Sequence, residues 1–195
     1  MPRQGLNRDT IVEASIRLIE EKGYAAFSMS ELAKSLNIKT ASLYNHIESL
    51  DTLCTEVGLA AVAQMVAKEQ KAIEGKEKDE ALFAIADAYR AFAKEHNELY
   101  RVIMSLQKSK NEVLERAAGQ ITGPIMQVLS GYGLSKTEQM HWQRILRSMM
   151  HGFAAHEEAG GFSHFPVDKD ESYRMAVQCI ADGLPNAGKK QHEYK

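Results

Sequence analysis

The stretch FSMSELAKSLNIKTASLYNHI, residues 27–47, contains two short helical patterns separated by a single turn. In the first pattern, Ser28 and Glu31 have the spacing of a capping box, in which each side chain satisfies a backbone N–H of the other residue. Four apolar side chains follow at the spacing of one helix face: Met29, Leu32, Ala33 and Leu36. Asn37 is one of the few residue types besides glycine that tolerate left-handed backbone, so the first helix is predicted to end there.

The second pattern begins at Lys39 or Thr40 and directs Leu43 and Ile47 toward a core. The helical period then puts a set of hydrogen-bonding side chains on the outer side and at the end of the helix: Thr40, Ser42, Tyr44, Asn45 and His46. A solvated helix face usually carries Lys and Glu, whereas this face is short, uncharged and contains an exposed aromatic ring. Contact with a partner therefore explains the segment better than solvation alone.

The sequence outside this stretch is helical in period almost everywhere and lacks alternating runs rich in Val, Ile and Thr. Upstream, the apolar positions predict a first helix over residues 8–22. Asn7 or Asp9 can cap its start, and Gly23 can take the left-handed conformation that ends it. The predicted fold class is therefore all-α.

The chain has 195 residues, is 44% hydrophobic and carries a formal net charge of -2. Its length is sufficient for a sizeable core, and its weak charge neither implies nor excludes a polyanionic partner. Cys54 and Cys179 lie far apart among helix-type apolar residues, and no apolar signal core follows the N-terminal charges. These features predict buried thiols in the cytoplasm, a reducing compartment. No uninterrupted run of about 18 apolar residues is found, so no membrane partner is expected.

Residues 7–53 resemble the DNA-binding domain of the TetR/AcrR family of bacterial transcriptional repressors. The resemblance rests on the end of the first helix, EEKGY, on the stretch LAKSLNIKTASLYNHI, and on the long helix that starts after ESLDTL. It implies that residues 28–47 form a helix-turn-helix whose last helix enters the major groove of an operator DNA. The predicted N-terminal domain comprises residues 1–53.

The resemblance also assigns roles to individual side chains. It places Thr40, Ala41, Ser42 and Asn45 toward the bases, and Ser28, Tyr44 and His46 toward the phosphate backbone, with Lys39 beside them. Hydroxyl, amide and imidazole groups suit both tasks, and the methyl group of Ala41 can contact a thymine methyl. Leu50 stands where the family commonly has a phosphate-binding lysine. The candidates for electrostatic attraction to DNA are then Lys39, Lys34, Arg3 and Arg8.

The remainder of the chain has the pattern of a larger bundle of five or six helices over residues 54–186, followed by a frayed tail over 187–195. One helix is predicted to bend at Gly123 and Pro124, because proline removes a backbone donor and crowds the preceding turn. The stretch MMHGFAAHEEAGGF resembles a family subgroup with a Trp-His-Gly motif, in which Met150 replaces the tryptophan. This resemblance implies a homodimer in which the last two long helices of each subunit form a four-helix bundle.

Aromatic and methionine side chains in this second domain indicate an apolar cavity for a small-molecule effector. The candidate ligand-binding residues are Tyr89, Phe92, Tyr100, Met104, Met126, Trp142, Met149 and Phe153. Most residues of this kind form a core rather than a binding site. Trp142 and Tyr89 are the stronger candidates, because their polar tips need partners when they are buried.

Histidine and glutamate side chains of the second domain do not have the spacing of a metal site. His151 and His156 are five residues apart and lie on different helix faces, and the single Glu-x-x-His unit lacks the second copy that a di-iron bundle needs. Neither a metal nor another cofactor is expected, and no motif of a known catalytic frame is found. The predicted function is a cytoplasmic, ligand-responsive repressor that binds a palindromic operator as a dimer. The alternative is a helical-bundle enzyme or carrier whose N-terminal helices mediate protein contacts.

Overall fold

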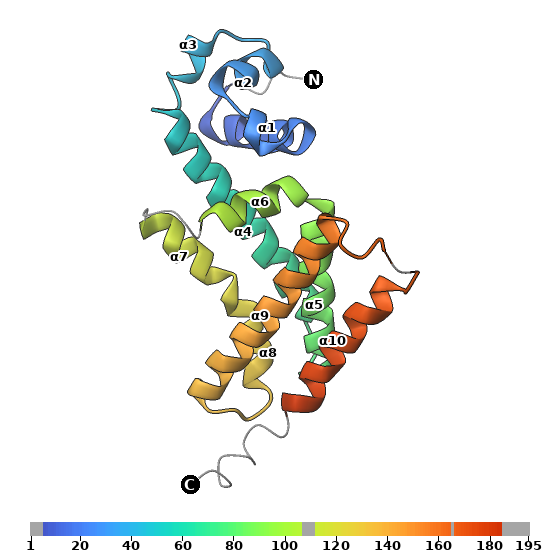
Figure 1. Ribbon diagram of the computed structural model, residues 1–195. Coiled ribbons are helices and arrows are strands. Elements are labelled where there is room, and N and C mark those ends of the chain that lie inside the picture. The colour runs from blue at the N-terminus through green and yellow to red at the C-terminus, as the bar shows by residue number, and fades with distance from the viewer. Residues whose placement is uncertain (1–5, 107–111, 165, 185–195) are drawn as a thin grey trace. The chain divides into compact units, whose positions relative to one another are not determined.

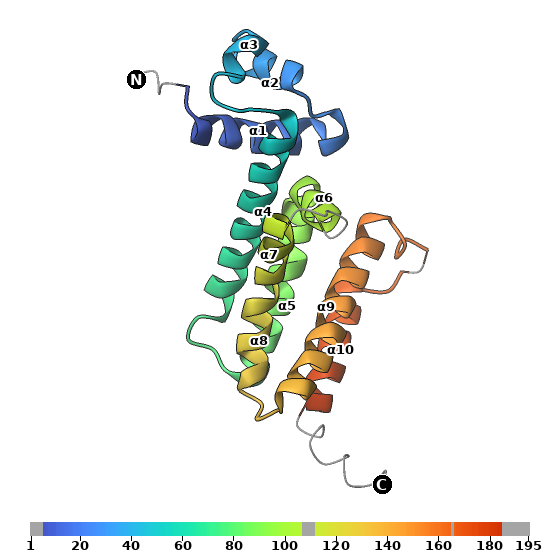
Figure 2. The same cartoon turned by 90° about the vertical axis from the view of Figure 1, so that its left-hand side faces the viewer.

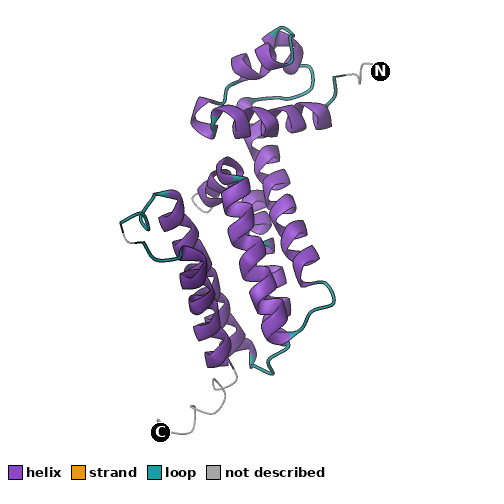
Figure 3. Cartoon of the chain, turned by 90° about the vertical axis from the view of Figure 1, so that its right-hand side faces the viewer, coloured by secondary structure: helices purple, strands orange, loops and turns teal. Residues whose placement is uncertain are grey.

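The computed structural model describes residues 6–106, 112–164 and 166–184, apart from the side chains of residues 114, 115 and 118. All regular structure in these residues is helical, with no strand among them (Figure 3). The α-helices are labelled in Figure 1. In chain order the helices are α1 (Arg8–Lys22), the 3-10 helix η1 (Tyr24–Ala26), α2 (Met29–Ser35), α3 (Thr40–Leu43), α4 (Leu50–Ile73), α5 (Lys78–Glu95), α6 (Asn97–Leu106), α7 (Glu112–Gln120), α8 (Thr122–Ser130), α9 (Lys136–Glu158) and α10 (Lys169–Gly183). The all-α prediction is confirmed.

Contacts divide the chain into two compact units. The first unit consists of Met1–Gln64 and His96–Ala118, and the second consists of Met65–Glu95 and Gly119–Lys195. Helix α4 contributes its first part to one unit and its last part to the other. Helix α6 belongs to the first unit, where it packs against α1 and η1. The first unit is therefore built from two segments that are separated in the sequence.

Helix α1 has the bounds that its apolar pattern predicts. Its cap is Asn7, whose side-chain oxygen accepts a hydrogen bond from the N–H of Thr10 at 2.9 Å. The hydroxyl of Thr10 in turn accepts from the N–H of Asn7 at 3.0 Å, so two free donors at the helix start are satisfied together. The helix ends at Gly23, which has a φ of 87° that other residue types rarely adopt.

The turn between α2 and α3 also forms at the predicted residue, since Asn37 has a φ of 54°. Ser28 caps α2 by accepting from the N–H of Glu31 at 3.2 Å. The Glu31 carboxylate does not complete the capping box. It accepts instead from Lys34 at 2.6 Å and from Lys22 at 3.1 Å, which ties α2 to the end of α1.

The break in the helical stretch after residue 112 lies at Ile121, between α7 and α8, rather than at Gly123 and Pro124 as predicted. Pro124 is the third residue of α8. The first turn of a helix has N–H groups without intrahelical partners, so a proline there costs no hydrogen bond. Pro124 therefore starts the second helix instead of bending one long helix.

Helices α5, α8, α9 and α10 supply the core of the second unit. Helix α5 packs against α8, α9 and α10, and α9 and α10 lie side by side (Figure 2). Tyr89 and Phe92 of α5 are fully buried, and so is Tyr173 of α10. The hydroxyl of Tyr173 donates to the carbonyl oxygen of Ala86 at 2.6 Å, which satisfies its polar tip inside this core.

Two sequence expectations about apolar residues are changed by the fold. Cys54 is half-buried, but Cys179 is exposed on α10, so the prediction of a buried thiol is wrong for Cys179. Helix α4 is long and apolar enough to cross a membrane by length and composition, because alanines join its larger apolar side chains into one stretch. Leu53, Val57 and Met65 of this helix are fully buried within the protein.

Candidate functional site

Residues 39–46, termed the recognition segment below, comprise the N-cap residue Lys39, helix α3 and the turn that follows it. Leu43 and Ile47 are fully buried and anchor the segment to the first unit. The N–H groups of His46 and Ile47 donate to the Leu43 carbonyl at 2.9 and 3.0 Å, so one more helical turn continues past α3. Tyr44 is 53% exposed at this turn, and the two polar side chains after it are exposed as well.

The first half of the recognition segment is less uniformly exposed. Lys39 and Ala41 are exposed, whereas Thr40 and Ser42 are half-buried. The N–H of Ser42 donates to the carbonyl of Lys39 at 2.9 Å, which closes the first turn of α3. Ala41 and Asn45 are four residues apart, so the two exposed members of the predicted base-contacting set share one helical face.

Ser28 lies at the start of α2 and is half-buried. Its oxygen already accepts the N–H of Glu31, but a hydroxyl also has a hydrogen to donate. The helix cap and a phosphate contact therefore use different parts of the same group, and Ser28 can serve both.

Two of the four cationic side chains expected to attract DNA are already engaged in ion pairs. Lys34 binds Glu31, and Arg8 binds Glu56 of α4 through its guanidinium group. The paired lysines lower the pKa of Glu31, so this carboxylate stays ionised and holds them. Lys39 is exposed, and Arg3 lies outside the described residues.

Leu50 is the first residue of α4 and is 37% exposed. The preceding Ser49 caps the helix, since its hydroxyl oxygen accepts from the N–H of Thr52 at 3.0 Å. Leu50 therefore lies at the N-terminal edge of the helix rather than inside the core. A longer side chain at this position can reach solvent.

The predicted ligand-binding residues are divided between the two units. Tyr100 and Met104 belong to α6 in the first unit, and the other six belong to the second unit. The terminal ring atoms of Trp142 lie against Gly183 of α10, where an added Cβ would approach the ring to 2.7 Å. The ring of Phe153 packs on Phe162 and Tyr173 with centroid distances of 4.7 and 4.9 Å. The structure thus places these two aromatic rings in helix packing.

Next to Phe153 lies a cluster of charges that sequence patterns did not reveal. The Arg90 guanidinium donates to both oxygens of Glu157, at 2.8 and 3.1 Å, and to Asp170 at 2.7 Å. It also stacks over the Phe153 and Tyr173 rings. Arg90 lowers the pKa of Glu157 to about 2, so the pair stays ionised across the neutral range. The cluster joins α5, α9 and α10.

A second pair of ionisable side chains in the same unit, Glu69 and Arg147, is not joined by hydrogen bonds. Glu69 of α4 is completely buried, and neither of its carboxylate oxygens has a hydrogen-bond partner among the described residues. Burial raises the pKa of Glu69 to about 8, while the charge of Arg147 on α9 opposes that rise. Nη2 of Arg147 is also buried without a partner in this part of the chain. Helical periodicity indicates that Glu69 is buried, since it lies one turn from each of the buried residues Met65 and Ile73. It gives no such indication for Arg147.

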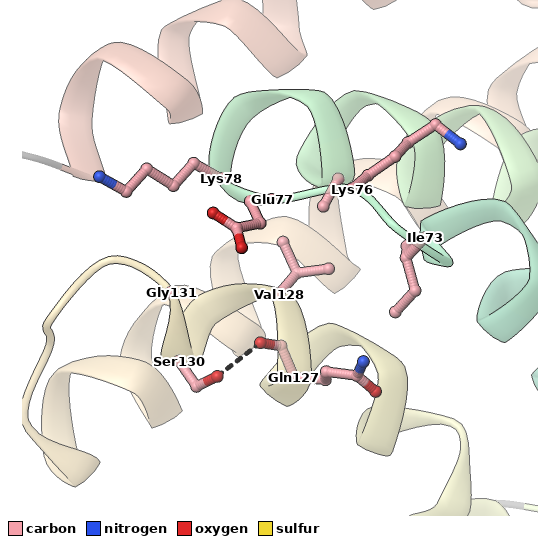
Figure 4. Close-up of a pocket in the computed structure, with 9 residues that line it drawn as sticks. Ile73, Lys76, Glu77, Lys78, Gln127, Val128, Ser130 and Gly131 are labelled. Carbon is pink, nitrogen blue, oxygen red and sulfur yellow. Dashed lines mark hydrogen bonds between the residues drawn. The ribbon is translucent and has the colours of Figure 1, made fainter.

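A pocket of about 320 Å³ lies where the loop between α4 and α5 meets α8. Ile73, Val128 and Gln127 contribute to its wall (Figure 4). The side chains of Lys76 and Lys78 extend in opposite directions from it, so they do not converge on a common ligand. The pocket contains none of the predicted ligand-binding residues. In addition, no three side chains of His, Cys, Asp or Glu come together as a metal site within the described residues.

Comparisons with known proteins agree with the arrangement of these elements. Residues 11–57 match the family described as bacterial regulatory proteins, tetR family, and residues 82–180 match the tetracyclin repressor-like C-terminal domain. The HTH-type transcriptional regulator YobS of Bacillus subtilis is 30% identical over 185 residues, which cover 94% of this chain and 95% of that protein. The Trp-His-Gly subgroup stays a prediction.

Two further similarities concern the DNA-binding part and the fold. The negative transcriptional regulator IcaR of the Staphylococcus aureus biofilm operon icaADBC is 48% identical over 42 residues, 22% of this chain and 23% of that protein. The structure of a protein from Rhodococcus sp. RHA1 has a TM-score of 0.82 at 17% identity and covers 94% of this chain and 98% of its own. The helix-turn-helix of the first unit and the helical second unit both have counterparts in one family of regulators. The chain belongs to the TetR family of bacterial transcriptional regulators.

Proposed function

We propose that this protein is a cytoplasmic repressor that binds a palindromic operator as a homodimer and leaves it when a small-molecule effector occupies the second unit. The observation that carries the proposal is the recognition segment, in which exposed, uncharged hydrogen-bonding side chains stand on two buried anchors, Leu43 and Ile47. The negative regulation named for the relative IcaR supports repression rather than activation.

The recognition segment divides its tasks by position. Ala41 and Asn45 contact base edges in the major groove, Ala41 through a thymine methyl and Asn45 through its amide. Tyr44, His46 and Ser28 contact phosphates and fix the register of the helix on the duplex. Thr40 and Ser42 are half-buried and lie beside the base-contacting side chains, which they help to position. The exposed Lys39 adds a positive charge that attracts the phosphate backbone.

The dimer forms through α9 and α10. Ile145 and Met175 are large apolar side chains, 48% and 63% exposed, and Cys179 is exposed one turn after Met175. Gly152 lies on α9 at the same helical face as Ile145, and no described atom comes within 4 Å of the place where its Cβ would be. Exposed apolar side chains together with a small residue are suited to the close approach of a second copy's helices.

Helix α6 carries the effector signal to the recognition segment. The chain passes directly from α5 of the second unit into α6 of the first. Within the first unit, the Glu98 carboxylate accepts from the N–H of Tyr24 at 2.8 Å, and His96 contacts Glu20 at 2.5 Å. An effector that shifts α5 thereby pulls on the end of α1 and changes the spacing of the two recognition segments in the dimer.

DNA binding is tested by selecting duplexes from a random-sequence library with the full-length protein. The expected product has two half-sites related by a dyad, with an affinity that falls steeply as salt concentration rises. A helical-bundle enzyme or carrier would enrich no common sequence, and that result would reject the proposal.

The dimer is tested by sedimentation of Gly152→Leu, with Gly123→Leu as a matched control. Gly123 is an exposed helical glycine whose Cβ position is also open. An added Cβ has open space around it at both positions, so the two substitutions are matched within a single chain and only Gly152→Leu is expected to weaken the dimer. An unchanged dimer in Gly152→Leu would place the interface on another face.

A further inference from the structure

The second unit contains a carboxylate that its fold does not use. Glu69 is completely buried on α4, and both of its oxygens lack hydrogen-bond partners among the described residues. Met65 and Ile73 lie one turn before and one turn after it on the same face of α4, and both are buried. A carboxylate in such surroundings is strongly unfavourable unless something pairs with it.

The group that acts on Glu69 lies on a different helix. Arg147 of α9 is the charged group whose field is felt at Glu69, yet no hydrogen bond joins the two. Nη2 of Arg147 is buried and lacks a partner in the described part of the chain. An acidic and a basic side chain thus lie near each other, and the atoms that could bond a ligand have no hydrogen-bond partner among the described residues.

Another group of charges in the same unit is closed by hydrogen bonds and ion pairs. Arg90 binds Glu157 through two hydrogen bonds, and Lys169 approaches Glu157 to 2.7 Å. A buried ionisable group that lacks its partner destabilises a fold. The unbonded pair of Glu69 and Arg147 therefore does not stabilise the second unit. Buried ionisable groups with perturbed pKa values cluster at functional sites.

We propose that Glu69 and Arg147 form the polar recognition site for the effector, which is a small amine on an apolar frame that also carries a hydroxyl or carbonyl oxygen. The ammonium group donates to the Glu69 carboxylate, and the oxygen accepts from Nη2 of Arg147. Glu69 decides the charge of the ligand, because both of its oxygens are unbonded and its side chain is the more deeply buried. The inference rests on the function proposed above and names the chemistry of its effector.

Binding of such an amine releases a proton. The neutral form of Glu69 prevails in the free protein near neutral pH, because burial raises its pKa to about 8. When the ammonium binds, the Glu69 proton goes to solvent and the carboxylate pairs with the positive charge. Affinity for the amine is therefore expected to rise as pH increases from 6 toward 8.

Three probes with the same phenyl frame test the two contacts separately by calorimetry on the full-length protein. They are 2-amino-1-phenylethanol with both groups, 2-phenylethylamine with the amine alone, and 2-phenylethanol with the hydroxyl alone. The expected order of affinity is amino alcohol, amine, alcohol, with about a tenfold step for each hydrogen bond to a charged group.

Two substitutions assign the steps. Glu69→Gln keeps the size of the side chain and should remove the preference for the amine over the alcohol. Arg147→Met should remove the preference for the amino alcohol over the amine. Glu80→Gln, at an exposed position of α5, should change neither ratio. Glu69→Asp retains the carboxylate, so it should keep part of the preference for the amine over the alcohol. That result would show that the loss of this preference in Glu69→Gln is not caused by misfolding.

The outcomes distinguish a failure of the proposed Glu69–Arg147 site from a failure of the proposed release of DNA by the effector. An unchanged order of affinities in Glu69→Gln, or no measurable binding of any probe, would overturn the recognition site. Operator binding is measured on the same samples. If the amino alcohol binds through Glu69 but does not weaken operator affinity, the release mechanism is wrong while the site remains.

Discussion

The recognition segment and the Glu69–Arg147 site both present polar groups without hydrogen-bond partners among the described residues, but they differ in burial. In the first unit, Tyr44 and Asn45 are exposed to solvent, which DNA would replace in the proposed function. In the second unit, Glu69 has no access to water. An exposed polar group costs little while it waits for a ligand, whereas a buried one destabilises the fold until the ligand arrives. The DNA site should therefore tolerate substitution, and the effector site should respond to pH.

The largest effect is expected at Arg90, the closed counterpart of the open Glu69–Arg147 pair. Arg90→Met leaves the largely buried side chain of Glu157, which is 11% exposed, without its main partner and should reduce the free energy of unfolding by about 3 kcal/mol. Base preference on DNA should not change. Urea denaturation followed by circular dichroism measures the loss. A destabilisation below about 1 kcal/mol would mean that the hydrogen-bonded pair of Arg90 and Glu157 does not stabilise the fold, and its contrast with the unbonded pair of Glu69 and Arg147 would be lost.

The same variant has a defined pH dependence. The pKa of Glu157 is lowered to about 2 in the folded protein, so its ion pair adds stability above the ordinary carboxylate pKa and loses it as pH falls toward 2. The difference between the natural protein and Arg90→Met should therefore shrink between pH 5 and pH 2.

Asn45→Ala sharpens the comparison from the side of the DNA. It should reduce discrimination between operator and unrelated duplexes by about 1–3 kcal/mol, because an amide contact to a base edge is lost. Tyr44→Phe is the matched control and should weaken all duplexes alike by about 1 kcal/mol. Neither variant should alter thermal stability, since both side chains are exposed. If Tyr44→Phe changed sequence preference and Asn45→Ala did not, the two roles would have to be exchanged.

The pH dependence of Glu69 is the next smaller effect. A carboxyl group whose pKa is raised on folding stabilises the protein at low pH and loses that contribution as pH rises through the folded value, here about 8. The natural protein should lose about 1.4 kcal/mol between pH 7 and pH 9 from this group. Glu69→Gln should not show this loss. Parallel pH profiles for the two proteins would mean that Glu69 is not buried as a neutral acid.

The smallest effect is expected from Leu50→Lys. Because Leu50 is 37% exposed beside the Ser49 cap, a lysine there can extend to a phosphate without being buried. One added phosphate contact should steepen the plot of log affinity against log salt by about 0.9 without changing specificity. A normal melting temperature with an unchanged salt slope would show that this helix edge does not face the backbone.

Sequence patterns predicted α1, α2 and the turn at Asn37 well, because the determinants of these elements are local. The caps at Asn7 and Ser28 and the left-handed Asn37 act within a few residues, and Leu43 and Ile47 are one helical turn apart. The same patterns missed every contact between segments distant in the sequence. They gave Lys34 and Arg8 as candidates for electrostatic attraction to DNA without indicating that both are in ion pairs.

The second unit was harder to predict for the same reason. Helical period marks Glu69 as a buried position, but it does not say that Arg147 lies on the neighbouring helix. It also gives Trp142 and Phe153 as apolar candidates for a ligand without showing that their rings pack on α10. Periodicity specifies which face of a helix is buried, and only the tertiary packing specifies what that face meets.

The split of the first unit into two segments has a consequence for exchanging parts between relatives. A hybrid regulator that takes its N-terminal part from this chain and the rest from another would inherit a foreign α6. The Glu98 carboxylate that holds the N–H of Tyr24, and the contact of His96 with Glu20, would then be lost unless the donor helix supplied equivalents. A hybrid that carries α6 along with α1 to α3 keeps these contacts. The transferable module is thus a discontinuous piece of sequence, and recombination at a single crossover divides it.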